Sequence, residues 1–203
     1  MKNQTRWIIV DTETDGLFAP VHVVEIAAQT MVGWEPHGEP FRVFLNHDIY
    51  IPPEATAVHG YTREFLARNG IDPVEAHSQF AEYADGAPIV CHNLSYDWNR
   101  ALVPEWQRLG LKLNMRAGFC SMLLARRVIY ETRKHNLDLL KSYFEIDTGK
   151  SHQAAADVAT VVELFRLVIS RRLQVAGIER FDDVCAFSRL TPIVKCHRRL
   201  RGC

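Results

Sequence analysis

The sequence predicts an α/β fold with a mixed sheet, because strand-like segments come first and a mixture of strands and helices follows. Residues 7–10, 23–32 and 40–45 are apolar segments rich in β-branched or aromatic residues. Short connections join them, which indicates an antiparallel meander. Helical patterns dominate from residue 62, and a further apolar strand is expected at 89–91.

Length and composition bound the class of protein. With 203 residues, 47% hydrophobic and 24% charged, the chain is long enough to bury a core. Because its formal net charge is zero, the molecule as a whole has no electrostatic field that would attract nucleic acid. No stretch of about 18 apolar residues occurs, so we expect a cytoplasmic protein with no membrane partner. The five cysteines include no Cys-x-x-Cys pair and are expected to be reduced thiols.

Helix boundaries follow from capping residues and breakers. Pro53 and Gly60 enclose one predicted helical turn, and Pro104 should kink or divide the helix that contains it. Ser151 is the expected N-cap of the last long helix. The predicted helices cover residues 62–67, 72–84, 94–109, 120–130, 137–144 and 152–173.

No domain boundary is evident before about residue 176, where the charge balance changes. The last acid is Asp183, and the residues after it carry five positive charges: Arg189, Lys195, Arg198, Arg199 and Arg201. Residues 1–175 are therefore expected to form one domain. Residues 176–203 would be a basic C-terminal tail, either solvated or in contact with a polyanion, or the start of a small C-terminal module.

Two carboxylates follow the first predicted strand. Because side chains alternate along a strand, Asp11 and Glu13 should project from the same face. Two adjacent anions repel each other, and a hard cation such as Mg²⁺ accepts oxygen ligands of this kind. A solvated strand end is the alternative.

Two further stretches place acids at element junctions. Asn93 could cap the helix after the strand at 89–91, with Asp97 four residues further on. His152 lies at the entry of the last long helix, and Asp157 lies one and a half turns into it. The alanines between and after them leave one side of this helix bare, which permits close approach by a sheet or a substrate.

In this order, the three stretches resemble the motifs of the DnaQ-like, DEDDh family of 3′→5′ exonucleases. Residues 24–27, 51–60 and 135–140 are similar to further segments of that family. Residues 119–127 and the basic tail resemble its exonuclease X subgroup, although Cys120 and Ser121 stand where many members carry an Asp-Thr pair.

The resemblance implies an RNase H-like fold, with a mixed five-stranded sheet and helices on both faces. It also implies that four acids hold two divalent metal ions, Mg²⁺ or Mn²⁺. Asp11, Glu13 and Asp157 would bind the first ion, whereas Asp11 and Asp97 would bind the second. His152 would be the general base that takes a proton from the attacking water.

The implied substrate is a nucleic acid with a free 3′ end. Thr14 would contact the terminal 3′-hydroxyl, Leu17 and Phe18 would stack on the last bases, and His59 and Asn93 would complete the pocket. Ordinary surface packing is the alternative for Leu17 and Phe18. Single-stranded DNA is favoured over RNA, with release of nucleoside 5′-monophosphates and a possible polymerase or repair partner. The alternatives are an exoribonuclease and a non-catalytic, polymerase-associated subunit that binds nucleic acid.

Overall fold

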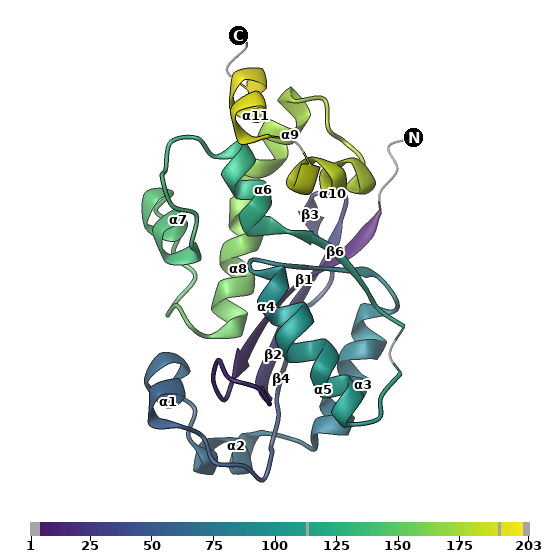
Figure 1. The fold of residues 1–203 in the computed structure, drawn as a ribbon, viewed down its shortest axis with the longest axis vertical. Helices are drawn as coiled ribbons and strands as arrows, with labels where there is room; N and C mark the ends of the chain where they lie inside the picture. The colour runs from purple at the N-terminus through teal and green to yellow at the C-terminus, as the bar shows by residue number, and fades with distance from the viewer. Residues whose placement is uncertain (1–4, 113, 191, 201–203) are drawn as a thin grey trace.

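The computed structural model describes residues 5–112, 114–190 and 192–200, which fold around one mixed sheet (Figure 1). Its strand order is β3-β2-β1-β5-β6, and β4 also pairs with β2. β2 runs antiparallel to β1, β3 and β4, whereas β5 runs parallel to β1 and β6. The predicted mixed sheet is confirmed, with a two-residue strand, β3, in addition to five longer strands. The strands are β1 Arg6–Thr14, β2 Val23–Val32, β3 Glu35–Pro36, β4 Phe41–Phe44, β5 Pro88–Cys91 and β6 Arg116–Cys120.

The central strand β1 is buried on both faces of the sheet. Trp7 and Ile9 belong to one hydrophobic cluster, whereas Ile8 and Val10 belong to another. This division follows from the alternation of side chains along a strand. The position of β1 between two cores fixes the direction in which its last residues project.

Helices cover both faces, as predicted. On the face of Trp7, the core includes residues of α6 Ser121–Val128, α8 Ala154–Leu164, α9 Ser170–Val175 and α10 Phe181–Leu190. A π-helical segment, Phe165–Ile169, joins α8 to α9, and α7 Leu137–Tyr143 packs against α8. On the other face, the core includes residues of α3 Pro73–Ala84 and α5 Val103–Arg108.

Two short helices, α1 Pro53–His59 and α2 Arg63–Asn69, enclose a third, smaller cluster. α1 begins at a proline and ends at Gly60, whose φ of 88° is the left-handed conformation that closes a helix. The predicted helical turn is therefore confirmed.

The predicted helix 94–109 is divided into α4 Leu94–Tyr96, a π-helical segment Asp97–Leu102 and α5. Pro104 has no N–H to donate to the carbonyl of Arg100, so the regular helical ladder cannot continue through this point. The interruption at the proline is confirmed, and it takes the form of a wider turn just before it.

The residues beyond 176 form α10 and α11 Ile193–Leu200, both of which contact α6. The ring centroid of Phe181 lies 5.9 Å from that of Trp7 and 5.3 Å from that of Phe119. The expected boundary at residue 176 stays a prediction. Among the described residues, no helix combines the length and the apolar character that crossing a membrane requires.

Candidate active site

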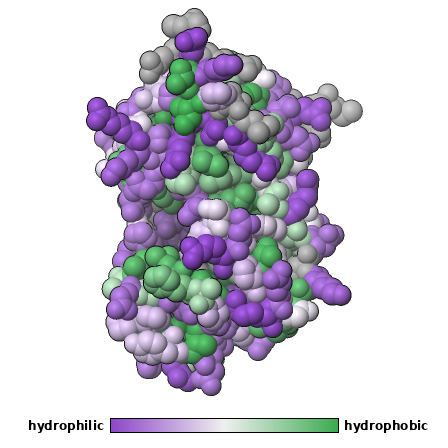
Figure 2. Space-filling model, viewed as in Figure 1, coloured by the Kyte–Doolittle hydropathy of each residue, from purple (hydrophilic) through white to green (hydrophobic). Residues whose placement is uncertain are grey.

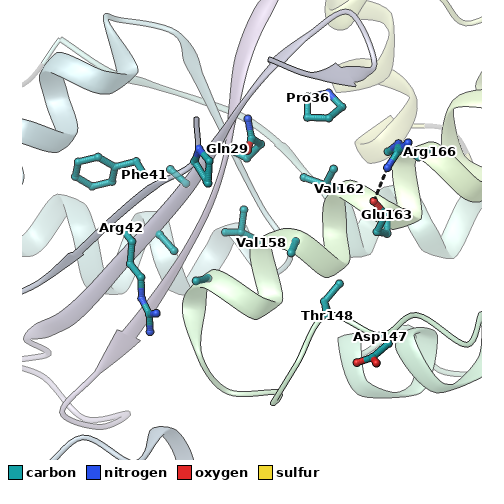
Figure 3. Close-up of a pocket in the computed structure, with 15 residues that line it drawn as sticks. Gln29, Pro36, Phe41, Arg42, Asp147, Thr148, Val158, Val162, Glu163 and Arg166 are labelled. Carbon is teal, nitrogen blue, oxygen red and sulfur yellow. Dashed lines mark hydrogen bonds and ion pairs between the residues drawn. The ribbon is translucent and has the colours of Figure 1, made fainter. Parts of the chain in front are cut away.

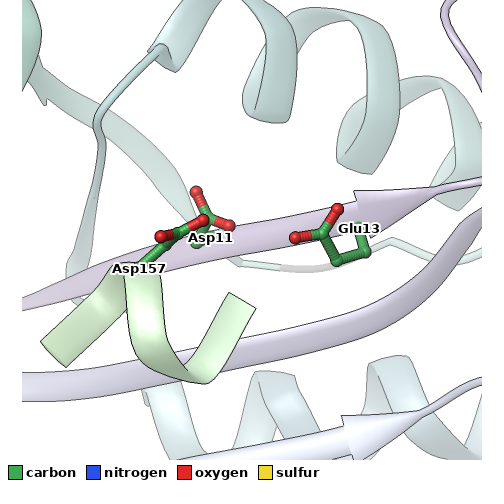
Figure 4. A group of neighbouring side chains, drawn as sticks. All are labelled: Asp11, Glu13 and Asp157. Atoms are coloured by element: carbon green, nitrogen blue, oxygen red, sulfur yellow. The ribbon is translucent and has the colours of Figure 1, made fainter. Parts of the chain in front are cut away.

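Three carboxylates meet near the carboxyl end of β1 (Figure 4). Asp11 and Glu13 project from the same face of this strand, and Asp157 comes from the first turn of α8, which packs on β1. Their ligand oxygens all lie within 4.8 Å of one another. The local strand pattern brings Asp11 together with Glu13, and the packing of one helix adds Asp157, which follows Glu13 by 144 residues in the chain.

The fold holds these carboxylates close together, so their negative charges repel one another. Burial raises the pKa of Asp11 well above its usual range, and the charges of Asp97 and Asp157 raise it further. Burial, followed by the charge of Glu25, raises the pKa of Glu13 to about 8. Burial also raises the pKa of Asp157 to about 6. A divalent cation would relieve this repulsion, and an all-oxygen donor set fits Mg²⁺ or Mn²⁺.

Asp97 lies next to the three carboxylates but outside the group. Its Oδ1 accepts hydrogen bonds from the backbone N–H of Thr12 at 3.2 Å and from the Thr12 hydroxyl at 2.8 Å. Burial raises the pKa of Asp97 to about 6, although these two hydrogen bonds act in the opposite direction. The fourth predicted acid is therefore fixed to β1 through the residue between Asp11 and Glu13.

His152 lies on a turn before α8, with a φ of 61°. Its backbone N–H donates to Asp157 Oδ2 at 3.2 Å, whereas its imidazole Nε2 lies 3.6 Å from Asp138 Oδ2 on α7. The side chain is 55% exposed. The backbone of His152 thus contacts the carboxylate cluster, but its ring is paired with α7.

The prediction that Ser151 caps this helix was wrong. α8 begins at Ala154, and Gln153 occupies the N-cap position without a hydrogen bond from its side chain. The left-handed turn at His152 separates Ser151 from the helix. An acceptor from another strand, Glu25, takes the place of a local cap and accepts a hydrogen bond from the N–H of Ala154 at 3.1 Å.

Glu25 is a part of the site that was not predicted as a functional residue. It is fully buried on β2, opposite Glu13 in the antiparallel register. Its carboxylate accepts hydrogen bonds from Arg42 Nε at 2.7 Å and from the Tyr61 hydroxyl at 2.8 Å, in addition to the bond from α8. An acid within the mainly apolar segment that was predicted as the second strand was the signal in the sequence.

A pocket of about 700 Å³ adjoins Glu13, between the loop after β1 and α1. Four of the five predicted substrate-contacting residues line it: Thr14, Leu17, Phe18 and His59. Leu17 is 64% exposed and Phe18 is 88% exposed. The fifth, Asn93, does not line this pocket, and its Oδ1 accepts a hydrogen bond from Ser95.

Two polar groups shape this pocket. The Tyr96 hydroxyl lies 2.6 Å from the Thr14 hydroxyl and donates to the carbonyl of Gly16 at 2.7 Å, which fixes the start of the exposed loop. Burial lowers the pKa of His59, and its Nδ1 accepts a hydrogen bond from Tyr61 N–H at 3.0 Å. The Nε2 of His59 is also buried, and a hydrogen bond with the backbone of Thr14 acts against the lowering of the His59 pKa.

A second groove, of about 460 Å³, lies between the β2–β4 edge and α8 (Figure 3). Ala155 and Ala159 line it, which agrees with the expectation that alanines leave one side of this helix bare. A hydrogen-bonded ion pair between Glu163 and Arg166 lies at one side of the groove, with 2.8 Å between Oε1 and Nη1. None of the three clustered carboxylates lines this groove, so it is separate from the candidate active site.

Comparison with known proteins identifies the class. The exonuclease family described as RNase_T matches residues 8–165, which include all five predicted catalytic positions. DNA polymerase III subunit epsilon of Salmonella typhimurium is 31% identical over 173 residues, covering 79% of this chain and 70% of that protein. The corresponding subunit of Escherichia coli is 30% identical over 172 residues, with the same coverage of 79% and 70%.

Solved structures agree on the fold. Exonuclease X in complex with 5′-overhanging duplex DNA superposes with a TM-score of 0.62 at 24% identity, over 88% of this chain and 99% of that one. The zinc-bound E. coli exonuclease I complex with single-stranded DNA gives a TM-score of 0.65 at 18% identity, over 83% of this chain. The chain spans 41% of exonuclease I.

The chain is an enzyme of the 3′→5′ exonuclease class, and it belongs to the DnaQ-like exonuclease family. The predicted RNase H-like fold is confirmed. Membership of the exonuclease X subgroup stays a prediction.

Proposed function

We propose that this exonuclease removes nucleoside 5′-monophosphates from the 3′ end of single-stranded DNA. The observation that carries the proposal is the group of three carboxylates within 4.8 Å, next to a pocket with two exposed apolar side chains, Leu17 and Phe18. Relatives of this chain are named as subunits of DNA polymerase III, and one solved neighbour is named as a complex with single-stranded DNA.

The pocket would bind the terminal nucleoside. Leu17 and Phe18 present apolar surface on which the flat faces of bases stack, and each stacked base contributes about 1–3 kcal/mol. Thr14 and His59 would bind the sugar end, because both are polar residues that line the pocket. Asn93 would act from outside the pocket, as a contact to the strand rather than to the terminal nucleoside.

Asp11, Glu13 and Asp157 would hold one divalent ion, and Asp11 with Asp97 would hold a second. When bound, the ions stabilise the charge on the attacking and leaving oxygens of an in-line phosphoryl displacement.

His152 would accept the proton of the attacking water, while the bond from phosphorus to the 3′-oxygen of the neighbouring nucleotide breaks. To do so, its imidazole must turn from Asp138 toward the carboxylates, and its 55% exposure leaves room for this rotation.

Digestion of 5′-labelled oligonucleotides tests the proposal. We expect a ladder that shortens from the 3′ end with Mg²⁺ and stops with EDTA. Asp157→Asn should remove nearly all activity, and His152→Gln should lower kcat by about 10²- to 10⁴-fold. Asp182→Asn, in the exposed first turn of α10, is the matched control and should retain full activity.

Matched DNA and RNA oligonucleotides separate the substrate classes. Faster shortening of RNA would overturn the preference for DNA and favour an exoribonuclease. Absence of any release with either Mg²⁺ or Mn²⁺ would favour a non-catalytic subunit that associates with a polymerase.

A further inference from the structure

A third cavity, of about 620 Å³, lies between α6, the loop that follows it and α11. We call it the basic groove, because the residues that line it include Arg126, Arg133 and Lys134 and no aspartate or glutamate. The three cationic side chains are exposed, and Figure 2 shows strongly hydrophilic side chains gathered over the region of the α6–α7 loop. Nothing in the proposed chemistry uses this groove.

The positive charge of the basic groove is not compensated nearby. Within the part of the chain that the structure describes, Arg126, Arg133 and Lys134 form no ion pair. Glu131, an acid in the same loop, is bound by two guanidinium nitrogens of Arg172, which also bonds to the carbonyl of Val128. A molecule with zero formal net charge thus concentrates unpaired cations at this place.

The loop that lines the basic groove leads toward the candidate active site. This loop is fixed to the strand end after β5, because the carbonyl of His135 lies 2.8 Å from His92 Nε2. The same loop leads directly into α7, where Asp138 lies 3.6 Å from the imidazole of His152. The pocket that contains Leu17 adjoins the carboxylates through Glu13, which lines it, whereas α7, which follows the loop of the basic groove, contacts α8.

We propose that the basic groove binds the phosphodiester backbone of the nucleic acid strand that enters the active site, upstream of the terminal nucleotide. The inference rests on the proposed function and adds the path of the substrate. With the 3′-terminal nucleoside in the pocket and its phosphate at the carboxylates, the remaining strand must leave on another side. The α7 side offers unpaired Lys and Arg side chains, which bind phosphates independently of base sequence.

Binding measured against salt concentration tests the groove without any turnover. The double variant Arg133→Gln/Lys134→Gln is compared with Arg68→Gln/Lys112→Gln, which removes two exposed cations elsewhere. Fluorescence anisotropy of a labelled single-stranded oligonucleotide in EDTA, at several NaCl concentrations, gives the slope of log K against log salt. The loss of two phosphate contacts should reduce the size of this slope by about 1.4, at about 0.7 per contact. The control variant should have the same slope as the wild type.

Turnover with Mg²⁺ gives a second readout. The groove variant should raise KM for a long oligonucleotide and leave kcat unchanged for one too short to reach the groove. Equal slopes in the groove and control variants would overturn the inference while leaving the exonuclease proposal intact. Failure of the wild type to shorten any oligonucleotide would overturn the proposed function, and the slopes in EDTA would still decide whether the groove binds a polyanion.

Discussion

At the scale of single residues, Glu25 connects β2 to the helix that carries Asp157. Its carboxylate accepts bonds from Arg42, Tyr61 and the first N–H of α8, and it has no exposed surface. Because α8 lacks a side-chain cap of its own, this buried acceptor helps to fix the position of Asp157 relative to Asp11.

Replacing Glu25 with glutamine tests this role. Glu25→Gln keeps the size of the side chain but removes the charge that faces Arg42. We expect the free energy of unfolding to fall by about 1.5–3 kcal/mol, the typical value for a hydrogen bond to a charged group. Because the charge of Glu25 raises the pKa of Glu13, the pH profile of activity should also shift to lower pH.

Urea denaturation and a pH–rate profile measure the two effects. Glu39→Gln, an exposed glutamate before β4, is the control and should change neither. A variant that is destabilised but keeps the wild-type pH profile would show that Glu25 supports the fold alone.

Patterns in the sequence predicted which residues form much of the candidate site, but they did not predict how the side chains of those residues are oriented. The pairing of Asp11 with Glu13 followed from strand alternation, which is local. The direction of the His152 ring did not, because a left-handed turn and a contact with Asp138 on another helix determine it. Tyr96 was missed for the same reason, since its role depends on a contact with Gly16 across 80 residues.

At the scale of elements, apolar patterning located β1, β2 and β4 but missed β6. The segment Arg116–Cys120 contains no β-branched residue. Its Gly118 is required by close packing, because a Cβ there would lie 2.9 Å from the Phe181 ring and 3.0 Å from the carbonyl of Ile89. Such a strand is defined by its neighbours, and a pattern read along the chain does not reveal it.

The attachment of α5 to the sheet gives a prediction for one element. Glu105 accepts a hydrogen bond from Val23 N–H at 2.7 Å, and its Oε1 lies 2.8 Å from His47 Nε2. Burial alone would raise the pKa of Glu105, but bonds with His47 and His77 lower it to about 2. A carboxyl group whose pKa is lower in the folded state stabilises the protein above the unfolded pKa, and that contribution is lost as pH falls.

Glu105→Gln should therefore destabilise the protein at neutral pH, by an amount on the order of 3 kcal/mol. The difference from wild type should shrink as pH falls from about 4.5 toward 2, where the wild-type carboxylate takes up a proton. Denaturation at a series of pH values measures this, with the exposed Glu82→Gln as control. A constant difference at all pH values would assign the loss to packing.

At the scale of the whole molecule, charge is separated although the formal net charge is zero. Carboxylates gather at the end of β1, and unpaired cations gather in the basic groove. The acids need a cation in order to be ionised together, whereas the cations are free to attract phosphates. The same arrangement predicts that metal binding contributes to stability as well as to catalysis.

Without metal, stability should fall as pH rises from about 5 to 8. The pKa values of Asp97 and Asp157 are raised to about 6 and that of Glu13 to about 8, all above their unfolded values. Groups shifted in this direction stabilise the fold while they are protonated, and this stability is lost as they ionise. Mg²⁺ at a hundredfold its Kd should restore about 2.7 kcal/mol, which raises Tm by about 5–10 °C.

Thermal unfolding in EDTA and in Mg²⁺, at both pH values, measures this linkage between metal, protons and folding. The rise in Tm should be larger at pH 8, because protons compete with the metal at pH 5. Asp157→Asn removes one repelling charge and one ligand, so it should flatten the pH dependence in EDTA and reduce the response to Mg²⁺, whereas Asp182→Asn should behave as wild type. An equal response to Mg²⁺ in Asp157→Asn and wild type would mean that the ion stabilises the protein at a place other than these carboxylates.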